Sequence, residues 1–189
     1  MKQVYADSIQ KAKNYYDNGQ DILHDLSHSD RVAELAKQIA EAVNYNDTDI
    51  LEVCAFWHDV ARTRGVEPHE EAGAVMARDD LLSRRASEED ANKAYEGIRF
   101  HKSTAQPTTI EGKIVRDADK LDIFTVSRWQ ACADAGWKEE YSDDLRKTVE
   151  VMGKYPDAFT YDFSKDLYAK RKPEFLAFWK SVKDQLPKA

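Results

Sequence analysis

The sequence predicts an all-α protein, on two observations. Apolar residues recur at helical spacing along nearly the whole chain, and almost no segment alternates apolar and polar residues as a half-buried strand does. The chain of 189 residues is 42% hydrophobic and 33% charged, which is typical of a globular protein. It is also long enough to bury a sizeable core. We therefore expect a single domain over residues 1–189, with the C-terminal helices packed on the same core as the rest.

The first half of the chain predicts four helices with histidines on their inner faces. The first spans residues 25–43 and places His28 one turn before Val32. The second begins near residues 46–49, whose side-chain oxygens can cap it, and His58-Asp59 closes it. A short helix then carries His69, and a fourth begins at Ser87. The faces that we expect to be buried contain Val32, Leu35, Ala36, Ile39, Ala40 and Val43; Ile50, Cys54, Trp57, His58 and Ala61; His69, Ala72, Gly73 and Met76; and Ala91, Ala94, Tyr95, Ile98 and His101.

The second half predicts one long helix and several amphipathic ones. The long helix begins after residues 107–109 and continues to about residue 135, with Asp119 and Asp122 on the same face as Val115 and Val126. Further helices follow from residue 137, are broken at residues 153–156 and start again near Pro173. The last one has a packing face of Phe175, Phe178, Trp179, Val182 and Leu186.

Charge and hydropathy argue against several kinds of partner. The net charge is −7 and no lysine or arginine stripe is present, so we expect no binding to a nucleic-acid backbone. No apolar run approaches the ~20 residues of a membrane span, and residues 1–7 lack the apolar core of a signal peptide. We expect a cytoplasmic protein with no membrane partner and with Cys54 and Cys132 as reduced core residues. A homo-oligomer stays open, although no heptad run supports one.

Four polar residues at the inner faces or ends of three helices indicate a metal site. A carboxylate such as Asp59 is disfavoured at a helix C-terminus unless a cation or a donor group compensates it. His28, His58, Asp59 and Asp119 together offer two imidazoles and two carboxylates, a set that suits one divalent cation in a helical bundle. Any one of these histidines alone is better explained as a hydrogen-bonded core residue.

Three ordered segments resemble the signature of the HD-domain metal-dependent phosphohydrolases. They are HDLSHSDRV at residues 24–32, FWHD at 56–59 and RDADKLD at 116–122. The resemblance covers about residues 20–130, and it implies an HD-domain helical bundle with a C-terminal helical extension at about residues 137–189. In that family the second histidine of the first segment, the HD pair and the distant aspartate bind a divalent metal. The resemblance thus implies the same ligands, His28, His58, Asp59 and Asp119.

Two further histidines, His69 and His101, fall between the HD pair and Asp119. Binuclear HD proteins carry additional histidines in this interval, so the resemblance implies either a second metal or a phosphate contact here. A structural role for both residues is the remaining alternative. His24 we expect to support a ligand from behind or to cap a helix. The metal could be Mg, Mn, Fe, Ni or Co, as one ion or two.

The implied reaction is hydrolysis of a phosphate ester, with a cation polarising a phosphoryl oxygen and lowering the pKa of a water molecule. Asp122 is a candidate general base or water-orienting group, and a surface or ion-paired aspartate is the alternative. Lys120 and Lys102 are candidates to neutralise phosphate oxygens. Arg62 and Arg64, on the loop after the HD pair, are candidates to clamp a phosphate.

The chain departs from some HD subgroups immediately after the HD pair. Nucleotidase-like and guanosine-tetraphosphate-hydrolase-like members carry an acidic residue there, whereas this chain has Arg62. The substrate therefore stays open among a nucleotide, a sugar phosphate, a cyclic nucleotide and another small phosphorylated metabolite, and so does the choice between phosphomonoesterase and phosphodiesterase. Two other functions are retained as alternatives, a di-iron HD-type oxygenase and a non-catalytic module that binds a nucleotide or a metal.

Overall fold

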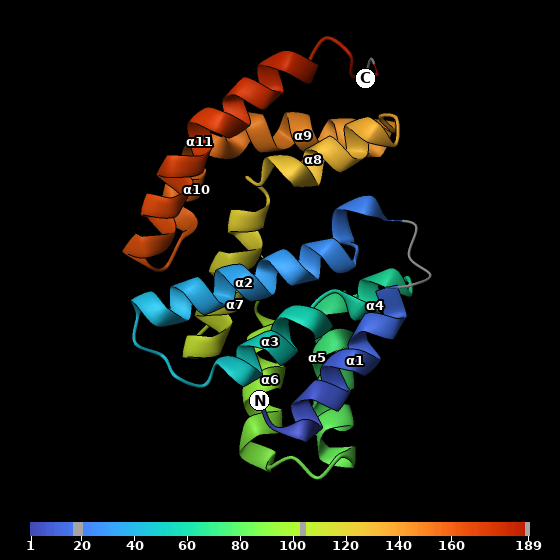
Figure 1. Cartoon of the computed structure of the whole chain (residues 1–189), viewed down its shortest axis with the longest axis vertical. Coiled ribbons are helices and arrows are strands. Elements are labelled where there is room, and N and C mark those ends of the chain that lie inside the picture. The colour runs from blue at the N-terminus through green and yellow to red at the C-terminus, as the bar shows by residue number, and fades with distance from the viewer. Residues whose placement is uncertain (17–20, 103–104, 188–189) are drawn as a thin grey trace.

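The computed structural model describes residues 1–16, 21–102 and 105–187, and those residues form helices and no strand (Figure 1). The prediction of an all-α protein is confirmed. No helix within the described ranges is both long enough and apolar enough to cross a membrane. In chain order the elements are α1 (Gln3–Tyr16), η1 (Ile22–His24), α2 (Leu26–Ala42), α3 (Thr48–Trp57), α4 (Val60–Thr63), α5 (His69–Ser83), α6 (Glu88–Arg99), α7 (Ile110–Asp122), α8 (Val126–Asp134), α9 (Glu139–Val151), η2 (Met152–Lys154), α10 (Tyr155–Ala158) and α11 (Asp162–Val182).

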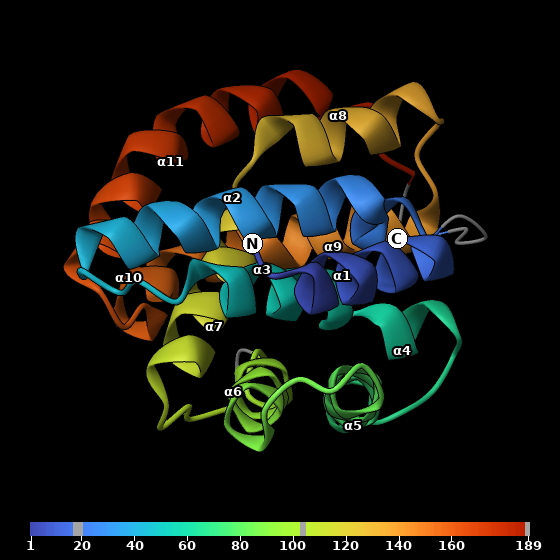
Figure 2. The ribbon, with the colours of Figure 1, turned by 60° about the horizontal axis from the view of Figure 1, so that its bottom comes forward.

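Helix α2 lies between two groups of helices. On one side α3 packs on α2 and on α1, and the antiparallel pair α5 and α6 packs against α3 and α7 (Figures 1 and 2). On the other side α8, α9 and α11 gather, and α11 contacts α7, α8 and α2. The middle of the molecule is therefore formed by α2, α3 and α7, the helices that carry the candidate ligands.

One hydrophobic core runs through both groups of helices. Buried side chains extend from Tyr5 in α1 through Trp57 and Leu121 to Phe175 and Phe178 in α11. The expectation that the C-terminal helices share the core is confirmed. The division between an HD core at about residues 20–130 and an extension at about 137–189 stays a prediction.

The long helix expected between residues 107 and 135 is wrong, because it is two helices. Helix α7 ends at Asp122, and α8 begins at Val126 after a turn. Phe124 in this turn is buried and packs edge-on against Tyr155 and Phe175. Arg171 donates to the Leu121 carbonyl at 3.1 Å, which satisfies a group left free at the end of α7. Packing and capping by the distant C-terminal helix thus stabilise the break.

One other expected boundary differs, and one is confirmed. Helix α11 runs from Asp162 through Pro173 without interruption, because buried residues on both sides of the proline, Tyr168 and Phe175 among them, hold its packing face. At the HD pair, α3 ends at Trp57 and α4 begins at Val60, so His58 and Asp59 lie between two helices. The predicted helix end at this pair is thereby confirmed, although Ala61 belongs to the next helix.

Candidate metal centre

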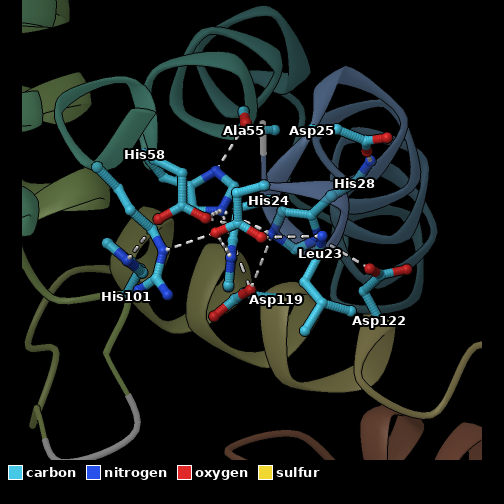
Figure 3. Close-up of polar contacts among 12 residues, drawn as sticks. Leu23, His24, Asp25, His28, Ala55, His58, His101, Asp119 and Asp122 are labelled. Atoms are coloured by element: carbon cyan, nitrogen blue, oxygen red, sulfur yellow. Dashed lines mark hydrogen bonds and ion pairs between the residues drawn. The ribbon is translucent and has the colours of Figure 1, made fainter. Parts of the chain in front are cut away.

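The structure brings His28, His58, Asp59 and Asp119 together. His28 lies in the first turn of α2, whose N-cap Asp25 accepts the His28 backbone N–H at 3.0 Å. Asp119 lies in the last turn of α7. Figure 3 shows the side chains of His28, His58 and Asp119 directed toward a common point. Three segments far apart in the sequence therefore supply this cluster.

The donor atoms of these four residues are close enough to share one ion. Nε2 of His28 lies 3.1 Å from Nε2 of His58. Oδ2 of Asp59 lies 3.3 Å from the His58 Nε2 and 3.6 Å from the His28 Nε2. Oδ1 of Asp119 lies 3.4 Å from the His28 Nε2. Two imidazole nitrogens and two carboxylate oxygens thus face one point, a donor set that suits a divalent cation.

A second group of donors lies on the other side of Asp59. Its Oδ1 is 3.5 Å from Nε2 of His69 and 3.8 Å from Nε2 of His101. The two carboxylate oxygens of Asp59 therefore face different pairs of imidazoles. This arrangement could hold two ions with Asp59 between them. The ligand atoms of His28, His58 and Asp59 lie within 4.8 Å of one another, and so do those of Asp59, His69 and His101.

The histidine rings are oriented in the way metal ligands require. In each of the four, Nδ1 lies within hydrogen-bond distance of an oxygen, and Nε2 is the nitrogen that faces the carboxylates. The Nδ1 partners are Asp122 Oδ2 for His28 at 2.7 Å, the Ala55 carbonyl for His58 at 2.8 Å, Glu67 Oε1 for His69 at 3.1 Å and the Ile98 carbonyl for His101 at 2.7 Å. An acceptor at Nδ1 favours the tautomer that leaves the Nε2 lone pair for a metal. At His28 the Arg128 guanidinium also lies 2.7 Å from Nδ1. The residues present therefore fit a metal ion.

The charges of the cluster are strongly coupled. Burial acts to raise the pKa of Asp119, but the hydrogen bond and charge of His28 lower it to about 2. Burial and Arg128 act to lower the pKa of His28, but its bonds to Asp119, Asp122 and Asp59 raise it to about 10. Burial lowers the pKa of His101 to about 4, helped by the charge of His58. At pH 7 the carboxylates are thus ionised and His101 is neutral, as ligands must be, whereas His28 carries a proton that metal binding would release.

Asp122 lies behind His28, on the side away from the other donors (Figure 3). It is fully buried, and it accepts bonds from His28 Nδ1, from Arg31 Nε at 2.6 Å and from Arg128 Nη1 at 2.9 Å. These contacts argue against the predicted role of Asp122 as a general base, because its oxygens are already engaged and turned away from the reacting side. The alternative stated from the sequence, an ion-paired aspartate, describes the geometry better, and Asp122 orients His28.

The four basic candidates have different surroundings. Lys120 is buried, and its Nζ has no hydrogen-bond partner within the described residues; burial and the charge of Arg116 lower its pKa to about 8. Lys102 lies 2.6 Å from Glu70 beside His69. The other two are Arg62, whose Nε lies 3.5 Å from Asp21, and Arg64, which stacks on Tyr15. Both arginines thus contact other side chains in this structure, and their expected role as a phosphate clamp stays a prediction.

The sequence analysis did not identify three charged residues that contact candidate site residues, namely Arg31, Arg128 and Asp21. Arg31 lies one turn after His28, within the quoted first segment, so helical spacing could have identified it. Arg128 comes from α8, and no local signal links it to His28. His24 lies in η1, where its Nδ1 is 2.7 Å from Asp21 and its Nε2 is 3.5 Å from Arg128. The expected supporting position of His24 agrees with these contacts, but its role stays a prediction.

The metal-free protein is expected to be most stable near pH 6.5. The pKa of His101 is lowered from 6.5 to about 4, so its contribution to folding improves as the pH rises from 4 to 6.5. The pKa of His28 is raised from 6.5 to about 10, so the stability that it contributes is complete below pH 6.5 and is lost as the pH rises toward 10. Between pH 6.5 and 8 the folded protein keeps the His28 proton that the unfolded chain releases, so the free energy of unfolding should fall by about 2 kcal/mol.

Urea unfolding in excess chelator at several pH values measures this change. The window ends at pH 8 because the lowered pKa of Lys120, about 8, acts in the opposite direction above it. A His28→Gln variant is the control and should lose most of the slope. If the free energy of unfolding falls as steeply with pH in the variant as in the wild type, His28 is not the group that causes the fall.

A family model, the HD domain, matches residues 25–123, more than half of the chain. The chain belongs to the HD-domain family. Family membership and the buried cluster together support a metal-dependent hydrolase, and neither defines its substrate.

Among curated relatives, ribonuclease Y of Ureaplasma parvum is 36% identical over 114 residues, which are 59% of this chain and 21% of the relative. The chain thus spans about a fifth of that protein. The uncharacterised protein YpgQ of Bacillus subtilis is 28% identical over 176 residues, which are 87% of this chain and 85% of the relative.

Solved structures show the same fold. A predicted HD superfamily hydrolase from an uncultured Thermotogales bacterium has a TM-score of 0.69 at 23% identity, over 95% of this chain and 91% of that one. The structure of YpgQ in complex with ADP has a TM-score of 0.65 at 22% identity, over 98% of each chain.

Proposed function

We propose that the protein is a metal-dependent phosphohydrolase that cleaves a phosphate ester of a nucleotide or of another small phosphorylated metabolite. One observation carries this proposal. Four buried imidazoles are each held at Nδ1 and present Nε2 to the carboxylates of Asp59 and Asp119. Such a site is assembled at considerable cost, because buried ionisable groups require partners, and a divalent cation is the partner that fits.

His28, His58, Asp59 and Asp119 would hold one ion, and Asp59, His69 and His101 would hold a second. Bound ions supply Lewis acidity toward a phosphoryl oxygen and lower the pKa of a water molecule. The protein itself orients the ligands through Asp122. It also keeps the cationic Lys120 beside Asp119, and a phosphate oxygen would satisfy the Lys120 ammonium, which has no partner among the described side chains.

The choice of a small substrate rests on charge and on the relatives. A net charge of −7 does not favour a long nucleic-acid backbone, although ribonuclease Y is a relative over the HD region. YpgQ, which resembles this chain over most of its length, has been seen with ADP. A nucleotide therefore leads the proposed substrates. That the protein is cytoplasmic, has no membrane partner and can form a homo-oligomer are also proposals.

A di-iron oxygenase is the second candidate. It is favoured by the approach of both His69 and His101 to the same oxygen of Asp59, which completes a six-residue donor set. It requires two iron ions for each chain, whereas the hydrolase requires no particular redox metal.

Metal analysis followed by a substrate screen tests the proposal. Protein purified without chelators is measured for bound metals, and it is then assayed against nucleotides, sugar phosphates, cyclic nucleotides and p-nitrophenyl esters with each metal added back. We expect metal-dependent release of phosphate or of an alcohol. Folded protein that neither binds nor requires a divalent metal would refute the proposal, and two irons without esterase activity would favour the oxygenase.

A further inference from the structure

A cavity of about 230 Å³ lies between η1, α8 and α9, beside the metal centre. We infer that it binds the organic group of the phosphate ester, and that this group is a nucleoside. The inference rests on the proposed function, since it assigns the part of the substrate that the metal centre does not contact. Two of the proposed ligands, His28 and His58, are fully buried, so their side chains offer such a group no exposed surface.

The cavity adjoins the metal centre through three of its lining residues. His24 stacks edge-on against His28 with ring centroids 5.8 Å apart. Arg128 reaches Asp122 at 2.9 Å, directly behind His28. Tyr155 packs edge-on against Phe124, which follows the end of α7, the helix that carries Asp119. His24, Arg128 and Tyr155 therefore line the cavity and also lie next to residues of the metal centre.

The lining suits a flat heterocycle with polar edges. Leu23, Ile123, Val151 and the indole of Trp129 form apolar walls. Thr148 and Asp144 offer hydrogen-bonding atoms between these walls. A cavity of about 150 Å³ accommodates benzene, so one of about 230 Å³ holds a larger ring system. Aromatic and aliphatic walls with few polar groups are the usual surroundings of a bound heterocycle.

Two cationic side chains line the cavity, one at the end nearest the metal centre, where the phosphate of the ester would lie, and one at the exposed rim. Arg128 is buried at the side nearest the metal centre, and its Nε has no hydrogen-bond partner within the described residues. Lys147 lies at the exposed rim, 4.0 Å from Asp144. A nucleoside phosphate, anionic at one end and heterocyclic at the other, matches this distribution better than a sugar phosphate, which has no flat apolar face.

A neighbouring cavity of about 330 Å³ shares Leu23, His24 and Asp144 but differs in charge. Its lining adds the carboxylates of Asp21 and Glu140, whose two negative charges balance the two positive charges of Arg62 and Lys138. With Asp144 the lining has an excess of negative charge, which disfavours an anionic ester. The smaller cavity, with Arg128 and Lys147 against Asp144 alone, is the better site.

Calorimetric titration tests the assignment without relying on turnover. Metal-loaded protein is titrated with inorganic phosphate, which needs only the metal centre, and with each of the four common ribonucleoside diphosphates. We expect at least one diphosphate to bind more tightly than inorganic phosphate. Thr148→Trp, which fills the cavity, should weaken that diphosphate at least about tenfold and leave phosphate binding unchanged. Circular dichroism confirms that the variant is folded.

Two matched charge reversals keep the test decisive if Thr148→Trp does not fold. Lys147→Glu should weaken the diphosphate about fivefold, whereas Lys138→Glu, in the neighbouring cavity, should change it less than about twofold. Any of three outcomes would overturn the inference. Lys138→Glu could weaken diphosphate binding more than Lys147→Glu does, or Lys147→Glu and Thr148→Trp could both bind the diphosphate with wild-type affinity. The third outcome is a wild-type protein that binds no diphosphate more tightly than inorganic phosphate. If no ester is hydrolysed but the expected binding pattern holds, the nucleoside site stands and the proposed hydrolase does not.

Discussion

Replacement of Asp59 by alanine is expected to remove metal binding and to lower the turnover of a phosphate ester by about three orders of magnitude or more. Asp59 is the one carboxylate in the described cluster that faces both groups of imidazoles, with Oδ2 toward His28 and His58 and Oδ1 toward His69 and His101. Its loss therefore affects either ion. Metal analysis of the purified variant and initial rates with the identified substrate measure the two effects.

His24→Ala is the matched comparison, because His24 lies beside the cluster and its hydrogen-bond partners are Asp21 and Arg128, not the carboxylates of Asp59 or Asp119. This variant should keep bound metal and measurable activity. If Asp59→Ala and His24→Ala behave alike in both measurements, the ligand assignment is wrong.

The four central donors could be predicted from local signals, namely helical periodicity for His28, His58 and Asp119 and the position at a helix end for Asp59. A residue at a buried position of a helix points inward wherever the helix is placed, so His28 and Asp119 could be assigned from the spacing of Val32 and Val115. The meeting of the three helices at one point was not available from periodicity. It came from the ordered resemblance to HD-domain proteins, and the structure brings those residues together.

The role of Asp122 could not be settled in the same way. Periodicity places Asp122 on the same helix face as Asp119, but it does not show on which side of His28 Asp122 lies. That is decided by the crossing of α7 over α2 and by Arg128, which reaches it from α8 after a helix break that the sequence did not predict. The break itself depends on Arg171, about fifty residues away, and on packing of Phe124.

Helix α1 shows the opposite case, a feature that the sequence contains and that the prediction did not use. Tyr5, Ile9, Ala12 and Tyr16 are buried and follow helical spacing. The hydroxyl of Tyr16 donates to the Phe56 carbonyl at 3.1 Å, just before the HD pair. The N-terminal helix thus supports the end of α3, and its contribution to the site could have been inferred from its pattern.

Replacement of Asp122 by asparagine is expected to produce the second largest effect, on stability and metal affinity together. The shape of the side chain is kept, but its negative charge, which holds His28, Arg31 and Arg128 in place, is lost. Arg128 is buried and would keep its charge with no carboxylate beside it. Breaking a buried ion pair from one side costs about 3 kcal/mol or more, and loss of the group that orients a ligand histidine weakens metal binding about 10- to 100-fold.

Urea unfolding of the metal-free variant measures the first effect, and titration with the identified metal measures the second. Asp30→Asn, on the exposed side of α2, makes the same change in net charge and should alter neither by a comparable amount. The acid limb offers a further check. Burial acts to raise the pKa of Asp122, but His28 and Arg31 hold it well below 3.8, so the stability that it contributes is lost only as the pH falls below that value. The asparagine variant should therefore lose less stability than the wild type as the pH falls below 4. If the two proteins lose equal stability over this range, Asp122 does not carry the buried charge that orients His28.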